Sequence, residues 1–135
     1  MELSEATRST AGVLLLSLVA VETGGLYLLR VAGGGVALTP FQRAFARAGH
    51  AHAGVLVTLG LAIQPLADAT ALDGPAASLA RSGIPLAAIL MAAGFFLSSA
   101  GRGATRPNAL VVLVYLGAAS LGVGAVVLGW GLLAA

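Results

Sequence analysis

The chain has 135 residues, of which 59% are hydrophobic and only 9% are charged. A soluble domain carries about 25% charged residues, so this composition argues against one. Four apolar stretches, each near the roughly 20 residues that cross a bilayer, take up most of the length. The composition predicts one all-α domain over residues 1–135, an integral membrane bundle of four transmembrane helices whose main partner is the lipid bilayer.

The net charge of +2 comes from seven arginines, since the chain has no lysine. Most of these arginines fall in two of the predicted loops, a distribution that indicates membrane topology and not nucleic-acid binding. The absence of cysteine excludes disulfides, thiolate metal sites and thiol redox chemistry. Glu2 and Glu5 precede the first apolar stretch, where a signal peptide would have basic residues, so we expect no cleaved signal peptide.

The first predicted span covers about residues 11–29, and the three glycines at 33–35 end it. Thr39 and Pro40 then predict the start of the second helix, because Thr is a good N-cap and Pro is tolerated in the first turn. The next residues alternate apolar and basic side chains, as expected at the level of lipid headgroups. The second span itself covers about residues 47–67.

The third and fourth predicted spans cover about residues 84–99 and 108–133. A loop over 68–82, with Gly74, Pro75 and Gly83 as helix breakers, is expected before the third span. A basic turn over 101–107 separates the last two spans.

The fourth span carries glycines at intervals of seven, namely Gly117, Gly124 and Gly131. This interval keeps them on one helix face, where a second helix can approach closely. Two uses remain open for these glycines: packing inside the chain's own bundle, or the seam of a homo-oligomer.

Arginine counts predict how the chain crosses the membrane. The first and third loops carry five arginines and no acid, namely Arg30, Arg43, Arg47, Arg102 and Arg106. The second loop is mixed, with Asp68, Asp73 and Arg81. The positive-inside rule places the first and third loops in the cytoplasm and both termini outside the inner (plasma) membrane.

Three ionisable side chains lie in apolar sequence: Glu22, His50 and His52. Such groups are costly in a membrane and indicate function by default. In a regular helix the two imidazoles point about 200° apart and cannot share one ion, although Gly49 and Gly54 would permit a break. We expect His50, on a small and polar face, to point into the bundle. His52, on a bulkier face, would meet lipid headgroups, a neighbouring protomer or a cofactor.

An ionised Glu22 alone in hydrocarbon would be costly, so we expect it to have a partner. At about 1.5 Å per residue from the first loop, Glu22 lies roughly 12 Å deep, His52 about 7 Å and His50 about 4 Å. This order favours a direct bond from Glu22 to His52, whereas His50 would need a bridging water. A shift of two to four residues in a helix boundary would reverse it.

Val21-Glu22-Thr23-Gly24-Gly25, followed by Leu29-Arg30, resembles the first helix of the small multidrug resistance transporters. In that family a lone membrane glutamate, followed by small residues and a basic one, binds protons and cationic drugs in exchange. The resemblance covers about fifteen residues and implies an exchange role for Glu22. The His50-x-His52 pair and the third span depart from that family. The pair itself is similar to histidine pairs of haem and copper membrane proteins.

These observations predict a proton or cation transporter or channel that works as a homo-oligomer. Glu22 would be the titrating group, and His50 and His52 the cytoplasmic gate or relay. The alternative is a membrane subunit of a redox assembly that binds haem, a transition metal or a quinone through His50 and His52, with Glu22 as a further metal ligand. An enzyme that acts on lipid is the third and least supported hypothesis, because the chain has neither paired carboxylates nor Ser/His/acid spacing, and no catalytic residue is assigned.

Overall fold

The computed structural model describes residues 2–135, so Met1 lies outside the described part of the predicted domain. These residues are mostly helical and contain no strand. The elements are α1 (Glu5–Ala32), α2 (Pro40–Ala62), α3 (Gln64–Asp68), α4 (Gly74–Ser98), the short 3-10 helix η1 (Ala109–Val111) and α5 (Val112–Leu133).

Four helices are long and apolar enough to cross a membrane, which confirms the predicted all-helical chain with four such segments. They are Glu5–Ala32, Pro40–Asp68, Gly74–Ser98 and Ala109–Leu133. Thr39 caps α2 as expected. Its hydroxyl accepts a hydrogen bond from the backbone N–H of Gln42, and the side-chain oxygen of Gln42 accepts one from the backbone N–H of Thr39. This reciprocal capping box fixes where the second helix begins.

The loop expected over 68–82 is shorter in the structure. Helix α4 already begins at Gly74, with Asp73 as N-cap and Pro75 in the first turn. A proline in the first turn needs no N–H donor and has a helical φ, so Gly74-Pro75 starts this helix instead of breaking it. Gly83, also expected as a breaker, lies inside α4.

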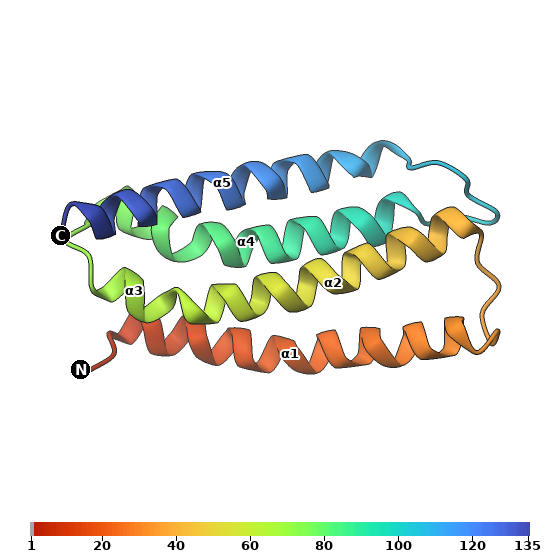
Figure 1. Ribbon diagram of the computed structural model, residues 1–135, viewed down its shortest axis with the longest axis horizontal. Helices are drawn as coiled ribbons and strands as arrows, with labels where there is room; N and C mark the ends of the chain where they lie inside the picture. The colour runs from red at the N-terminus through yellow and green to blue at the C-terminus, as the bar shows by residue number, and fades with distance from the viewer. Residues whose placement is uncertain (1) are drawn as a thin grey trace.

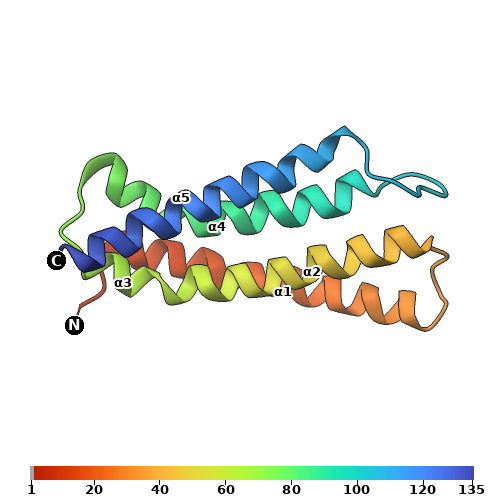
Figure 2. The same ribbon diagram turned by 45° about the horizontal axis from the view of Figure 1, so that its top comes forward.

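The long helices lie side by side in the order α1, α2, α4, α5 (Figure 1). The view turned by 45° shows the α4–α5 pair inclined to the α1–α2 pair, so that the two pairs lie closest at the end that holds both termini (Figure 2). The buried apolar residues belong mainly to the two central helices, for example Leu56 and Val57 of α2 and Ile84 and Ala87 of α4. The outer helices α1 and α5 bury little of their apolar surface, and Leu16 remains 76% exposed.

Helices α4 and α5 pack most closely, through the glycine series of the fourth span. A Cβ on Gly124 would lie 2.9 Å from Gly83 Cα, and one on Gly117 would overlap Met91. The Ser120 hydroxyl donates a 2.8 Å hydrogen bond to the Gly83 carbonyl at the same crossing. A Cβ on Gly131 would overlap the side chain of Leu72, which lies in the loop before α4. Contacts within one chain therefore occupy this glycine face, and a homo-oligomer would use another surface.

The first and third loops meet at one end of the molecule (Figure 1). The Gln42 side-chain amide donates to the carbonyls of Ser99 (3.0 Å) and Gly101 (2.8 Å). The Thr39 hydroxyl donates to the Ala104 carbonyl at 2.6 Å. These bonds hold the first and third loops together. Arg102 and Arg106 lie in the third loop, whereas Arg30, Arg43 and Arg47 lie in the adjoining turns of α1 and α2, so positive charge gathers at this end.

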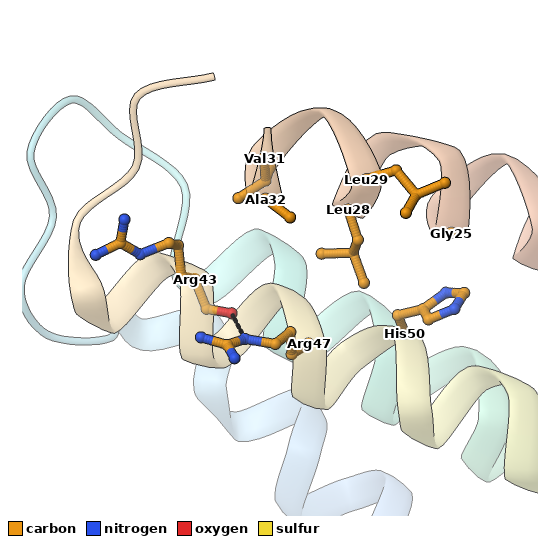
Figure 3. Close-up of a pocket in the computed structure, with 8 residues that line it drawn as sticks. All are labelled: Gly25, Leu28, Leu29, Val31, Ala32, Arg43, Arg47 and His50. Atoms are coloured by element: carbon orange, nitrogen blue, oxygen red, sulfur yellow. Dashed lines mark hydrogen bonds between the residues drawn. The ribbon is translucent and has the colours of Figure 1, made fainter. Parts of the chain in front are cut away.

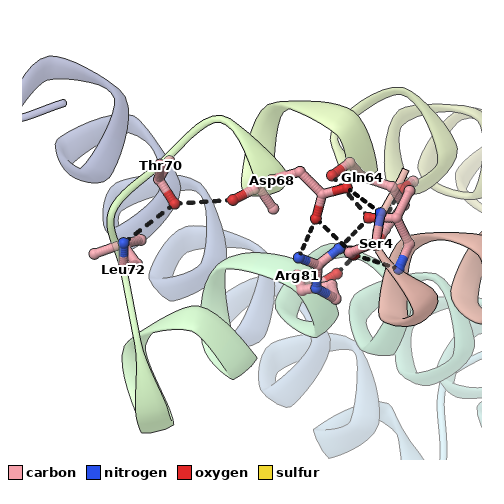
Figure 4. Close-up of polar contacts among 9 residues, drawn as sticks. Ser4, Gln64, Asp68, Thr70, Leu72 and Arg81 are labelled. Carbon is pink, nitrogen blue, oxygen red and sulfur yellow. Dashed lines mark hydrogen bonds and ion pairs between the residues drawn. The ribbon is translucent and has the colours of Figure 1, made fainter. Parts of the chain in front are cut away.

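The opposite end holds a polar network around Asp68 and Arg81 (Figure 4). Arg81 Nη2 lies 2.7 Å from Asp68 Oδ1, and the Ser4 hydroxyl and amide also donate to this carboxylate. Arg81 Nη1 donates to the Thr7 hydroxyl. The network ties the start of α1 to α3 and α4.

Gln64, fully buried at this end, compensates for a proline in the middle of a helix. Pro85 lies inside α4 and has no N–H, so the carbonyl four residues earlier, that of Arg81, loses its helical donor. Gln64 Nε2 donates to this carbonyl at 3.1 Å and to the Gly60 carbonyl at 2.8 Å. A buried glutamine is therefore required where α2, α3 and α4 meet.

Candidate functional site

His50 lies between α1 and α2, against two consecutive glycines. A Cβ on Gly24 would lie 3.2 Å from His50 Nδ1, and one on Gly25 would lie 3.6 Å from His50 Nε2. The side chain is half-buried and points toward α1 (Figure 3). The glycine pair thus provides room for the imidazole in the contact between the two helices.

A cleft of about 460 Å³ opens beside His50, between the last turns of α1 and the first turns of α2. Residues of α2 form one wall: Arg43, Arg47 and His50. Residues of α1 form the other: Gly25, Leu28, Leu29, Val31 and Ala32. Figure 3 shows Leu28 pointing across the cleft toward α2, between Arg47 and His50. One wall is therefore basic, and the facing wall is apolar.

Glu22 points away from this cleft. Gly25 lies opposite His50 and Val21 opposite Gly54, so Glu22 is level with the residue before Gly54 on α2. Its side chain is exposed on the outer face of α1, although its depth matches that expected for a bond to His52. Successive side chains point about 100° apart around a helix axis. Because Val21 faces α2, the side chain of Glu22 next to it points outward, although it lies at the predicted depth.

His52 lies on the face of α2 that packs against α4. Its ring is 4.9 Å from the Phe95 ring, and its Nδ1 is 2.8 Å from the Ala48 carbonyl. A carbonyl only accepts, so Nδ1 carries the proton and Nε2 stays free in the neutral ring. His52 also lines an open pocket with Val55 and Leu59, so its expected contact with headgroups, a neighbouring protomer or a cofactor stays a prediction.

The three predicted site residues do not form one constellation within the chain. Helix α2 runs unbroken through 50–52, so the two imidazoles point to different neighbours, α1 and α4. Within residues 2–135, no three His, Cys, Asp or Glu side chains are grouped so that they could hold a metal ion. A metal or haem site that uses Glu22, His50 and His52 would need ligands from more than one copy.

The cleft adds two residues, Arg43 and Arg47, that the sequence indicates only as topology markers. Both precede His50 at helical spacing, by seven and three residues, and this spacing already places the three side chains near one face of α2. What the sequence does not show is the apolar wall that α1 places opposite them.

Comparisons with protein-family models, with characterised proteins and with solved structures find no match to this chain.

Proposed function

We propose that the chain is a multi-pass protein of the inner membrane that assembles with further copies and moves protons or small cations past Glu22. The observation that carries this proposal is the exposed carboxyl of Glu22 on the outer face of α1. Its helical neighbours Val19 and Leu26 are 64% and 62% exposed. A charged side chain on such a surface costs about 3 kcal/mol in lipid, so a second copy that covers it would remove that cost.

The charge distribution supports membrane insertion with both termini outside. Five arginines and no acid surround the two loops at one end, whereas four of the five acids lie at the other end or near it. This asymmetry is what the positive-inside rule requires of a chain with cytoplasmic first and third loops.

His50 is the histidine suited to pass a proton on the cytoplasmic side of Glu22. It lies on the α1 side of α2, about one turn closer to the arginine-rich end than the level of Glu22. An imidazole can accept a proton on one ring nitrogen and donate one from the other, as a relay requires. His52, packed on Phe95, faces the other way.

The alternative is a subunit of a redox assembly that binds haem, a metal or a quinone through His50 and His52. Within residues 2–135 no three His, Cys, Asp or Glu side chains are grouped to hold a metal ion, so a metal site would need ligands from a second copy.

Proton or cation flux into liposomes that contain the purified chain tests the proposal. We expect Glu22→Gln to abolish most of the flux, because the amide cannot exchange a proton or hold a cation. Glu5→Gln removes the same charge from an exposed residue at the start of α1 and should leave flux unchanged. If flux survives in Glu22→Gln, Glu22 has no transport role. If the unchanged protein shows no flux, the chain does not transport these ions and the proposal is wrong.

A further inference from the structure

The cleft beside His50 concentrates positive charge that nothing in the described chain neutralises. Within residues 2–135 the one ion pair joins Arg81 to Asp68, at the far end of the molecule. Among these residues Arg43 and Arg47 therefore have no acidic partner, and no acid lines the cleft. Arg47 Nε donates a weak 3.4 Å hydrogen bond to the Arg43 carbonyl, which leaves the remaining guanidinium donors of both arginines free (Figure 3). An anionic group would satisfy them.

The cleft also changes character along its length. From the register of His50 on Gly25, Arg47 lies level with Leu28 and Arg43 level with Ala32, the last residue of α1. The arginines thus lie at the end of the bundle, where α1 leaves the apolar region. His50 lies about 10 Å deeper than Arg43, at about 1.5 Å per residue. A ligand that fits this gradient has an anionic head at the arginines and an apolar body along α1.

We propose that this cleft binds one anionic phospholipid per chain, with its phosphate on Arg43 and Arg47 and an acyl chain against Leu28 and Leu29. Basic pockets between helices on the cytoplasmic side are known to hold such headgroups. The volume of about 460 Å³ lies in the range of roughly 300–1,000 Å³ typical of small-molecule sites. Free phosphate would use the arginines but leave the leucine wall without a function. The proposal rests on the membrane insertion proposed above and is independent of transport.

Native mass spectrometry of the full chain in detergent, with phosphatidylglycerol or phosphatidylcholine added, tests this site. We expect one phosphatidylglycerol to be retained per chain, with much less phosphatidylcholine, and inorganic phosphate should not displace the lipid. Each arginine near a membrane surface contributes about fivefold in affinity, so Arg43→Gln with Arg47→Gln should weaken retention roughly 25-fold. The matched control is Arg102→Gln with Arg106→Gln, which removes the same charge from the third loop at the same end and should change retention little.

Leu28→Trp provides a second variant that keeps every charge. The indole fills the cleft from the α1 side and should weaken retention while both arginines remain. If the double arginine variant fails to fold, as judged by helical circular dichroism, Arg47→Gln alone should still lose about fivefold.

Three results would overturn the proposal: equal loss in the two double variants, retention unaffected by Leu28→Trp, or displacement by phosphate. The first two would indicate general surface charge, and the third an anion site without lipid. Loss of retention is scored separately from flux, so a chain that transports without retaining phosphatidylglycerol would contradict this inference alone.

Discussion

A methyl group added at Gly83 or Gly124, where α4 and α5 cross, should destabilise the fold. A Cβ on Gly83 would lie 2.7 Å from Gly124 Cα, whereas ordinary contact begins at 3.4 Å. The obstacle is backbone, so the helices must separate by about 0.7 Å in Gly83→Ala and, from the 2.9 Å distance of a Cβ on Gly124, by about 0.5 Å in Gly124→Ala. A gap of that size forfeits about a quarter to a half of each van der Waals contact along the seam.

We expect each of these variants to lower the free energy of unfolding by about 1–2 kcal/mol. Overpacking costs about 1–3 kcal/mol, and the better helix propensity of alanine returns up to about 1 kcal/mol. The hydrogen bond from Ser120 to the Gly83 carbonyl would also lengthen. One separation relieves both methyl groups, so the double variant should cost less than the sum of the two single ones.

Gly122→Ala is the matched control for this prediction. Gly122 lies on the same helix, two residues before Gly124, and a Cβ added to it would meet no atom within 4 Å. This variant should be neutral or more stable by about 0.5–1 kcal/mol, the intrinsic cost of a helical glycine. Thermal or denaturant unfolding in detergent, followed by circular dichroism, measures all of these variants against the unchanged protein. If Gly124→Ala is as stable as Gly122→Ala, the close approach of α4 and α5 does not exist.

Two further predictions concern the ends of the molecule. Arg81→Met should lower the free energy of unfolding by about 3 kcal/mol, because it leaves the largely buried Asp68 carboxylate without its cation. Arg8→Met, which changes an exposed arginine, is the control and should lower it far less in the same unfolding assay. Single cysteines at two exposed loop positions, Ala71→Cys and Thr105→Cys, report topology in a chain without other thiols. An impermeant maleimide should label position 71 in intact cells and position 105 only after lysis, and the opposite pattern would contradict cytoplasmic first and third loops.

Local signals of the sequence predicted the four long helices. The apolar stretches and the Thr39-Pro40 start are properties of neighbouring residues, so they needed no knowledge of the rest of the fold. The Gly74-Pro75 pair misled because the same two residues suit a loop and a helix start. In the structure they start a helix, a choice that these two residues alone do not indicate.

The faces of the helices were less predictable than their positions. Each residue turns a helix by about 100°, so Val21 meets α2 while Glu22 beside it faces outward. The depth of Glu22 and His52 in the bundle does not tell which way each side chain points around its helix axis. Depth alone therefore could not show whether the two side chains face each other or lie on opposite surfaces. The cleft at Arg43 and Arg47 was missed for a related reason, since its second wall comes from another helix.

The side-by-side order of the helices has a consequence for biosynthesis. The contacts between long helices join neighbours in the order α1, α2, α4, α5, so each of them can form as soon as the later helix of the pair has left the ribosome. The exception is the network of Ser4, Asp68 and Arg81, which joins the first helix to the fourth element. The nascent chain cannot complete this closure until α4 has been synthesised, which would make it a late step of assembly.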